Sequence, residues 1–270
     1  MLGIVPAAGQ AARLQPLGGS KELLPLGRAP TDRDGRGGGL RAVADYLLER
    51  MWLAGADRIC LVVGADKPDL LRYYGERAGA GKVFFAVQPR AAGLCDAVFR
   101  AARLVQPDEP VLIGLPDTVW YPRAAFVHGQ RACVHLITFP VAHPEDFDAI
   151  APAGRERVAR VEVKRPGDAQ RRVWGAITAP GREFLALERL WRRRGAQDVY
   201  LGDLLNAWIE AGQPVSFDRQ GTHYWDIGTP AGYERALAEA VWEEREGGQA
   251  PLQLQDSGGG VAAPAAPAES

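Results

Sequence analysis

Residues 1–27 read MLGIVPAAGQAARLQPLGGSKELLPLG. A short apolar run, Leu2 to Val5, is followed by small residues and then by two cations, Arg13 and Lys21. The run is typical of a buried strand. Because ligands of an open α/β sheet bind beyond the carboxyl ends of its strands, the segment after Val5 is a candidate ligand-binding loop.

Small side chains at Ala7, Ala8 and Gly9 leave the backbone of this loop open to a base or a phosphate. Arg13 offers a fork of donors and Lys21 a compact point charge, a pair suited to a polyphosphate. The G-x-G-x-x-G pattern of dinucleotide sites and the Gly-Lys-Ser/Thr of Walker loops are both missing here. A plain strand-to-helix turn with solvated cations stays open as an alternative.

The composition indicates a globular chain without bulk attraction to polyanions. It has 270 residues, 47% of them apolar, and a net charge of −1, which gives no sign of nucleic-acid or membrane binding. No apolar run approaches the roughly 18 residues of a membrane span, and we see no signal-peptide pattern. The three cysteines have neither metal-ligand nor disulfide spacing, so we expect ordinary thiols and a cytoplasmic protein.

Strand-like and helical segments alternate along the first half of the chain. This rhythm predicts an α/β fold with an open, mostly parallel sheet and helices on both faces. We expect strands at 2–5, 59–63, 83–87 and 111–115, with helices at 40–53 and 96–104. The second half is more mixed, with strands expected at 134–141, 158–163, 173–178, 215–217 and 224–227 and helices at 183–193, 200–211 and 229–246.

Two Gly-rich segments are expected to lie outside the packed fold. Residues 247–270 consist mainly of Gly, Ala, Pro, Ser and Gln, cannot bury enough apolar area to become ordered, and form a predicted disordered tail. Residues 27–39 are expected to form a surface loop. We therefore predict one domain over residues 1–246.

Five segments, in order, resemble those of the sugar-phosphate nucleotidyltransferases, in particular the glucose-1-phosphate thymidylyltransferases and uridylyltransferases. They are PAAGQAARLQPL with SKELLPL within 6–26, QPRAAGL at 88–94, GLPD at 114–117, VKRP at 163–166 and WDIGT at 225–229. The resemblance implies a Rossmann-like nucleotide-binding sheet with a smaller, mixed sugar-binding part. It also implies the reaction of a nucleoside triphosphate with a sugar 1-phosphate to give a nucleotide sugar and pyrophosphate.

The same resemblance assigns charged residues to the reaction. Arg13 and Lys21 would act on the triphosphate and Lys164 on the sugar phosphate. Asp117 and Asp226 would hold Mg²⁺, the implied cofactor and a hard cation that prefers oxygen ligands. Since the nucleophile is already a phosphate anion, positioning and electrostatics would supply the catalysis.

Uncharged residues would recognise the two substrates. The resemblance places the nucleotide against Ala7, Ala8, Gly9, Gln88 and Gly93. A glutamine amide both donates and accepts, which suits a pyrimidine edge and favours dTTP or UTP.

The sugar site implied by the resemblance departs from the family pattern. Its residues would be Asp148, Val163, Lys164 and Gly175. Asp148 stands where the family has a glycine and Val163 where it has a glutamate. A hydroxyl left without its partner would disfavour the usual glucose pose, so we expect another sugar or another pose.

Lysine is scarce, with four lysines against 28 arginines, so each one occupies a place where arginine is the usual cation. Lys21 and Lys164 fall on the two phosphate-binding lysines of the family. Lys67 and Lys82 match no motif, and we expect both at the surface.

Two further departures lie in the first loop, where Ala11 replaces the second glycine of the family and Ala12 its threonine. Alanine can replace glycine there without strain only if φ is negative, so the way this loop would hold the triphosphate is left open, whereas its charges match the family. A catalytically eroded nucleotide-sugar-binding or regulatory protein on the same fold stays open, although the intact charges argue against it. A dehydrogenase would need a glycine fingerprint. The expected partners are a nucleoside triphosphate and a sugar 1-phosphate, with no nucleic acid or membrane, and a homo-oligomer is compatible with this.

Overall fold

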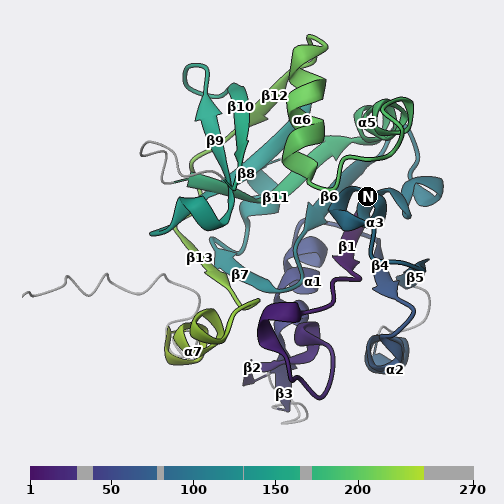
Figure 1. The fold of residues 1–270 in the computed structure, drawn as a ribbon, viewed down its shortest axis with the longest axis vertical. Coiled ribbons are helices and arrows are strands. Elements are labelled where there is room, and N and C mark those ends of the chain that lie inside the picture. Colours follow the sequence, from purple (N-terminus) through teal and green to yellow (C-terminus); the bar gives the residue numbers. More distant parts are fainter. Residues whose placement is uncertain (29–38, 78–81, 130, 165–171, 240–270) are drawn as a thin grey trace, which may run out of the picture.

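The structure is a computed structural model that describes residues 1–28, 39–77, 82–129, 131–164 and 172–239 (Figure 1). The expected tail at 247–270 and most of the expected loop at 27–39 lie outside these residues. Across the described ranges, no helix combines the length and the hydrophobicity of a transmembrane segment.

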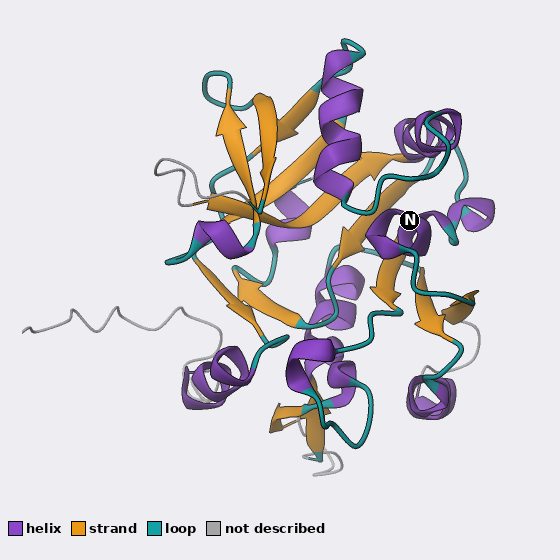
Figure 2. Cartoon of the chain, in the orientation of Figure 1, coloured by secondary structure: helices purple, strands orange, loops and turns teal. Residues whose placement is uncertain are grey.

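One mixed sheet of nine strands forms the centre of the molecule (Figure 2). Its parallel half contains β1 (Leu2–Ala7), β4 (Arg58–Gly64), β5 (Val83–Gln88) and β6 (Pro110–Gly114). Its other half contains β8 (Val134–Pro140), β9 (Asp148–Pro152), β10 (Val158–Val163), β11 (Arg172–Pro180) and β12 (Val215–Phe217). The order is β10-β9-β11-β6-β1-β4-β5, and β8 joins β11 to β12.

The change from parallel to antiparallel pairing occurs between β6 and β11. Strand β1 pairs in parallel with β4 and β6, and β4 with β5, whereas β11 runs antiparallel to β6. The predicted Rossmann-like α/β sheet is therefore confirmed, and the mixed second half forms the other part of the same sheet.

Two small sheets and seven α-helices complete the described fold. The small sheets are β2 (Pro25–Arg28) with β3 (Leu40–Ala42), and β7 (Thr118–Tyr121) with β13 (His223–Asp226). The helices are α1 (Val43–Leu53), α2 (Pro68–Arg77), α3 (Gly93–Phe99), α4 (Ala125–His128), α5 (Gly181–Arg193), α6 (Leu201–Glu210) and α7 (Pro230–Glu239).

Strand β1 is apolar without interruption because both of its faces are buried. Leu2 and Ile4 pack into a core that α3, α5 and α6 also enter, whereas Val5 and Ala7 pack into a second core with α1 and α2. A strand covered by helices on both sides needs apolar residues at every position. The expected helices on both faces are thus present, and the end of β1 is fixed from two sides.

Two expected helices have different limits. The helix expected at 40–53 begins at Val43, since the Asp45 carboxylate accepts the Ala42 N–H at 2.9 Å and caps the first turn. Leu40 belongs to β3 and is 67% exposed, so its helical spacing was coincidental. The helix expected at 96–104 is α3, which begins at Gly93 and is followed by a separate turn at Ala102–Leu104. Elsewhere, Cys60, Cys95 and Cys133 are free thiols, as expected.

Candidate active site

The pairing of β7 with β13 brings Asp117 and Asp226 together from distant parts of the chain. Asp226 is the register partner of Thr118, the residue after Asp117. The Ile227 N–H donates to the Asp117 carbonyl oxygen at 2.8 Å. The sequence around either aspartate does not indicate the other, because the two come together only in the folded molecule.

Two cations from the first loop reach these carboxylates. Lys21 Nζ lies 2.5 Å from Asp117 Oδ2, and Arg13 Nη2 lies 3.5 Å from Asp226 Oδ2. A Cβ atom placed on Gly228 would lie 2.8 Å from Asp226 Oδ1, 3.0 Å from Arg13 Nη2 and 3.1 Å from Asp117 Oδ2. Both carboxylates therefore border one small space, which a side chain at residue 228 would fill.

The electrostatics of this cluster favour an additional positive charge. Burial raises the pKa of Asp226, and repulsion from Asp117 raises it further. Burial lowers the pKa of the Lys21 ammonium, but the attraction and hydrogen bond to Asp117, together with the charges of Glu22 and Asp226, outweigh burial and the pKa lies above its ordinary value. Two like charges held close together in a partly buried place gain from any cation that binds between them.

The oxygen atoms of this carboxylate pair are suitable ligands for Mg²⁺, but they make up only part of a coordination shell. Carboxylate oxygens are the donors that Mg²⁺ prefers, and it commonly binds one or two of them together with substrate phosphates and water. Among the described residues, no cluster of three or more His, Cys, Asp or Glu side chains forms a complete metal site. Asp117 and Asp226 would accordingly hold the ion jointly with the substrate.

The candidate base site lies at the end of β5. Gln88 is 4% exposed, and its Nε2 donates to the Gly93 carbonyl at 3.1 Å and to Asp96 Oδ2 at 2.8 Å. Gly93 has φ +91°, and a Cβ there would lie within 2.9 Å of three atoms of Val199. The Leu94 N–H donates to the Val199 carbonyl at 2.9 Å, so this turn requires a glycine.

The candidate sugar site is a second cluster, built on β9, β10 and α6. Asp148 pairs with Val163 across the two strands, and a Cβ on Gly202 would lie 2.7 Å from Val163 Cγ2 and 3.0 Å from Asp148 Oδ2. The Lys164 ammonium lies 4.8 Å from the centre of the Tyr200 ring. Asp148 Oδ1 is buried without a hydrogen-bond partner, and burial raises the pKa of Asp148 to about 6.

Gly175 lies apart from the polar atoms of this cluster. It belongs to β11, and a Cβ there would lie 2.4 Å from Tyr224 Cε2 and 2.9 Å from two ring atoms of Phe139. The packing of these two rings therefore explains why residue 175 is a glycine. Its contact with a sugar stays a prediction.

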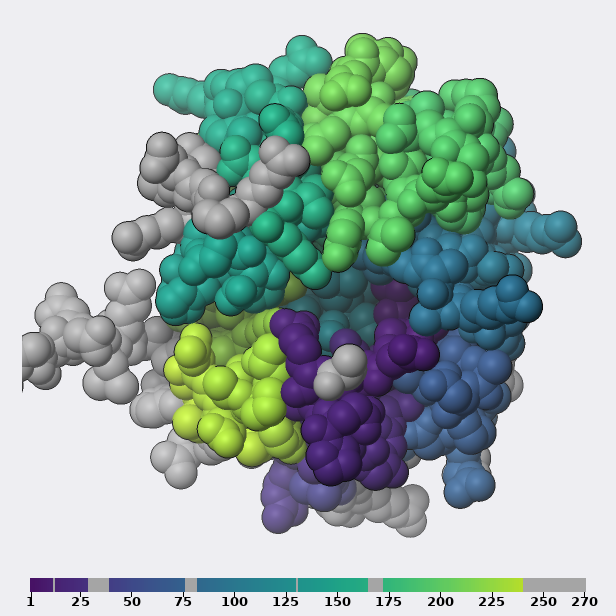
Figure 3. Space-filling view, in the orientation of Figure 1, coloured from purple at the N-terminus to yellow at the C-terminus, as the bar shows by residue number. Residues whose placement is uncertain are grey.

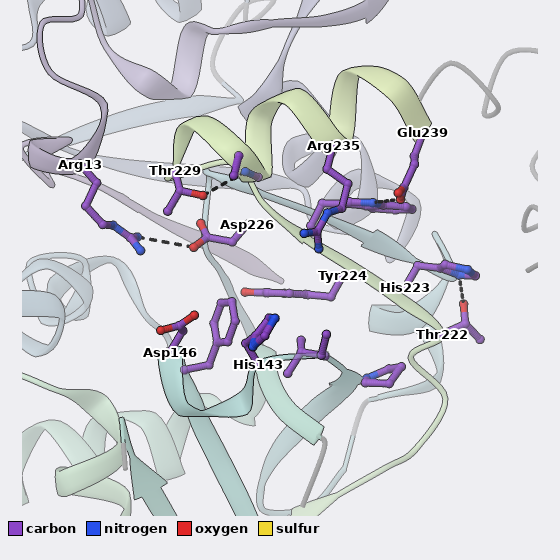
Figure 4. A pocket seen from close by; sticks show the side chains of 17 residues that line it. Arg13, His143, Asp146, Thr222, His223, Tyr224, Asp226, Thr229, Arg235 and Glu239 are labelled. Atoms are coloured by element: carbon purple, nitrogen blue, oxygen red, sulfur yellow. Dashed lines mark hydrogen bonds and ion pairs between the residues drawn. The ribbon is translucent and has the colours of Figure 1, made fainter. Parts of the chain in front are cut away.

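The molecular surface has a hollow. In Figure 3 it lies between the part of the surface that carries α6 and the part formed by the first loop and α7. A cavity of about 450 Å³ is lined by Arg13 and Asp226 on one side and by His143 and Asp146 on the other (Figure 4). Arg13 and Asp226 are the members of the carboxylate cluster that line it, so the cavity gives room beside that side of the cluster.

Ala11 does not meet the condition for an unstrained replacement of glycine: its φ is +53°, in the left-handed region, where it precedes the tight turn Ala12–Leu14. The expected surface position of Lys67 is wrong. Lys67 is 6% exposed, since its ammonium donates to the Ala7 carbonyl at 2.8 Å and to both oxygens of Glu22 at 2.9 Å. Lys82 is exposed as expected. Because lysine is scarce in this chain, its presence at residue 67 could have indicated a specific role. We assigned Lys67 to the surface because it matches no motif.

Comparisons with known proteins bear on the fold. No family model matches the chain. It is similar to a candidate glucose-1-phosphate thymidylyltransferase from Bacillus anthracis in complex with sucrose, with a TM-score of 0.73, 20% identity and coverage of 89% of this chain and 96% of the other. The chain therefore shares the fold of that protein. The resemblance predicted from the five segments is therefore confirmed at the level of the fold.

The chain is also similar to two further proteins. A UDP-glucose pyrophosphorylase from Acinetobacter baumannii has a TM-score of 0.69 at 18% identity, over 90% of this chain and 94% of the other. The bifunctional protein GlmU of Azorhizobium caulinodans is 29% identical over 176 residues, which is 60% of this chain. The chain spans 38% of the length of that curated relative.

Proposed function

We propose that this protein is a sugar-1-phosphate nucleotidyltransferase that releases pyrophosphate. One observation carries the proposal: Lys21 and Arg13 from the first loop pair with Asp117 and Asp226, which the fold brings together from two distant strands. A reaction between two polyanions needs positive charge to reduce their repulsion, and this site offers two cationic side chains and two carboxylates for a metal ion. The likeness to a thymidylyltransferase and a UDP-glucose pyrophosphorylase supports the same reaction.

In this proposal the residues act by positioning and by charge. Arg13 and Lys21 bind the triphosphate and stabilise the negative charge that grows on the departing pyrophosphate. Lys164 orients the sugar phosphate so that its oxygen attacks the α-phosphorus in line with the leaving group. Mg²⁺, held by Asp117 and Asp226, supplies charge neutralisation on the phosphate oxygens when bound. No general base is needed, because the nucleophile is already an anion.

The orientation of Gln88 favours uracil or thymine as the base. Both of its amide hydrogens have protein acceptors, the Gly93 carbonyl and Asp96, so its oxygen is left to accept. Uracil and thymine present an N–H at ring position 3, whereas cytosine presents an acceptor there. We therefore propose dTTP or UTP as substrates in preference to CTP, and the resemblance to thymidylyltransferases and uridylyltransferases favours them over purine triphosphates.

The sugar is proposed to differ from glucose or to bind in another pose. A buried Asp148 carboxyl replaces a glycine, and Val163 removes a carboxylate that would accept sugar hydroxyls. Both changes alter the hydrogen-bonding pattern that a hydroxyl-rich ring would meet.

The test is pyrophosphate release by the whole chain with a panel of triphosphates and sugar 1-phosphates, with and without Mg²⁺. We expect release only with a sugar 1-phosphate present, dependent on Mg²⁺, and fastest with dTTP or UTP. Binding of nucleotide sugars without release for any pair would favour a non-catalytic binding protein and contradict the proposal. Faster release with CTP would contradict the proposed role of Gln88.

A further inference from the structure

Lys21 belongs to a short segment that is held on both sides by the start of α2. Ser20, the residue before it, donates from its N–H to Asp69 Oδ2 at 2.7 Å and from its hydroxyl to Asp69 Oδ1 at 2.8 Å. Glu22, the residue after it, accepts from Lys67 through both carboxylate oxygens. Lys67 and Asp69 flank Pro68, the first residue of α2.

The Lys67 ammonium also reaches the end of β1. It has three hydrogens, and its three acceptors are the two oxygens of Glu22 and the Ala7 carbonyl. Both side chains of the ion pair are buried, with exposures of 7% for Lys67 and 1% for Glu22. If a buried ion pair loses one partner, the other charge is left buried and uncompensated, so separating Lys67 from Glu22 is costly.

Glu22 attracts the Lys21 ammonium and contributes to the rise of its pKa, and without Lys67 this charge would act on Lys21 uncompensated. Lys21 Nζ already pairs with Asp117, and a third uncompensated carboxylate nearby would compete with a triphosphate for its ammonium. Lys67 neutralises Glu22 inside the protein and leaves Lys21 directed towards the site. The Lys67 side chain extends from the connection between β4 and α2 to reach Glu22.

We propose that Lys67 and Asp69 are positioning residues that clamp Ser20–Glu22 against the end of β1 and keep Lys21 available to the triphosphate. The inference rests on the proposed function, since it takes Lys21 as the residue that acts on the triphosphate. It adds that the connection before α2, which matches none of the five family segments, sets the geometry of that residue.

The experiment compares Lys67→Met, Glu22→Gln and the double variant with Lys82→Met, the same substitution at an exposed lysine. Initial rates of pyrophosphate release are measured with the triphosphate varied, at a temperature where circular dichroism shows every variant to be folded. We expect Lys67→Met to lower turnover about tenfold or more, as expected for a displaced catalytic cation. Lys82→Met should match the wild type.

The double variant separates positioning by charge from a simple packing role. Removing both charges leaves no unpaired carboxylate at residue 22 to compete with Asp117 for Lys21, so turnover should return to within about threefold of the wild type. Wild-type turnover in Lys67→Met, or a double variant no faster than Lys67→Met, would overturn the proposal.

Hydrogen exchange of the ligand-free protein tests the clamp without the reaction. Peptides covering residues 19–24 should exchange faster in Lys67→Met and in Asp69→Ala, but not in Lys82→Met. Unchanged exchange in both clamp variants would overturn the proposal. If the wild type released no pyrophosphate at all, the proposed function would fail while this measurement still decided the clamp.

Discussion

At the scale of single residues, the first loop carries strain at Ala11. A left-handed φ costs a non-glycine residue roughly 1–2 kcal/mol, part of which is offset because glycine makes the unfolded chain more flexible. We expect Ala11→Gly to stabilise the protein by about 0.5–1 kcal/mol in urea denaturation. Ala196, with φ +57°, provides the control, since Ala196→Gly should stabilise by a similar amount. Destabilisation by Ala11→Gly would show that the loop does not need a positive φ.

Asp148 predicts a pH dependence of stability. Its pKa of about 6 in the folded protein lies above its ordinary value of 3.8, so the folded state binds more protons between these pH values. Stability should therefore fall as pH rises through this window. Asp148→Asn removes the effect and should gain roughly 1–3 kcal/mol at pH 7 but little near pH 4.

Urea denaturation of Asp148→Asn across this pH range checks the prediction. Asp146→Asn, at an exposed carboxylate two positions before β9, is the charge-matched control. An equal gain at pH 4 and pH 7 would show that the carboxyl does not titrate as its burial implies.

At the scale of elements, the turn between β5 and α3 depends on one glycine. Gly93→Ala adds both an unfavourable φ and a Cβ within 2.9 Å of Val199 atoms, whereas Gly212→Ala adds a φ of +80° in open space. We expect Gly93→Ala to cost roughly 2–3 kcal/mol and Gly212→Ala about 1 kcal/mol in thermal or urea unfolding. Gly93→Ala should also raise the triphosphate KM, because a shift of this turn would move the Gly93 carbonyl that accepts from Gln88. Equal costs for the two variants would mean that α3 shifts freely.

The strands of the parallel half were predictable because burial on both faces leaves continuous apolar runs, as in Leu2–Val5. The β2–β3 and β7–β13 pairs were not predicted as sheets, since short strands take their identity from distant partners. The same limit applies to the site. Motif matches indicated Asp117 and Asp226, but Lys67 was assigned to the surface because its partner Glu22 lies 45 positions away.

At the scale of the whole molecule, the two substrates should bind on opposite sides of the hollow. Arg13→Ala should lower turnover even with both substrates saturating, because Arg13 acts on charge that develops at the pyrophosphate. Lys164→Ala should first raise the KM of the sugar 1-phosphate, with losses of about ten- to a hundredfold for a charge-assisted contact.

Initial rates with each substrate varied in turn distinguish the two sides. Lys164→Arg should restore only part of the loss, since a planar guanidinium does not occupy the position of an ammonium. A higher triphosphate KM in Lys164→Ala, with the sugar phosphate unaffected, would mean that the two sides were assigned in reverse.

The central claim is that Asp117 and Asp226 act jointly in a Mg²⁺-dependent release of pyrophosphate. The most direct measurement is the rate of that release by the wild type, Asp117→Asn and Asp226→Asn at saturating Mg²⁺ with dTTP or UTP and the best sugar 1-phosphate. Each substitution keeps the side-chain shape but removes one of the two charges beside Lys21 and Arg13. We expect each variant to lose about a hundredfold or more of the turnover while its circular dichroism spectrum stays that of the wild type. Rates near that of the wild type in both variants would contradict the account.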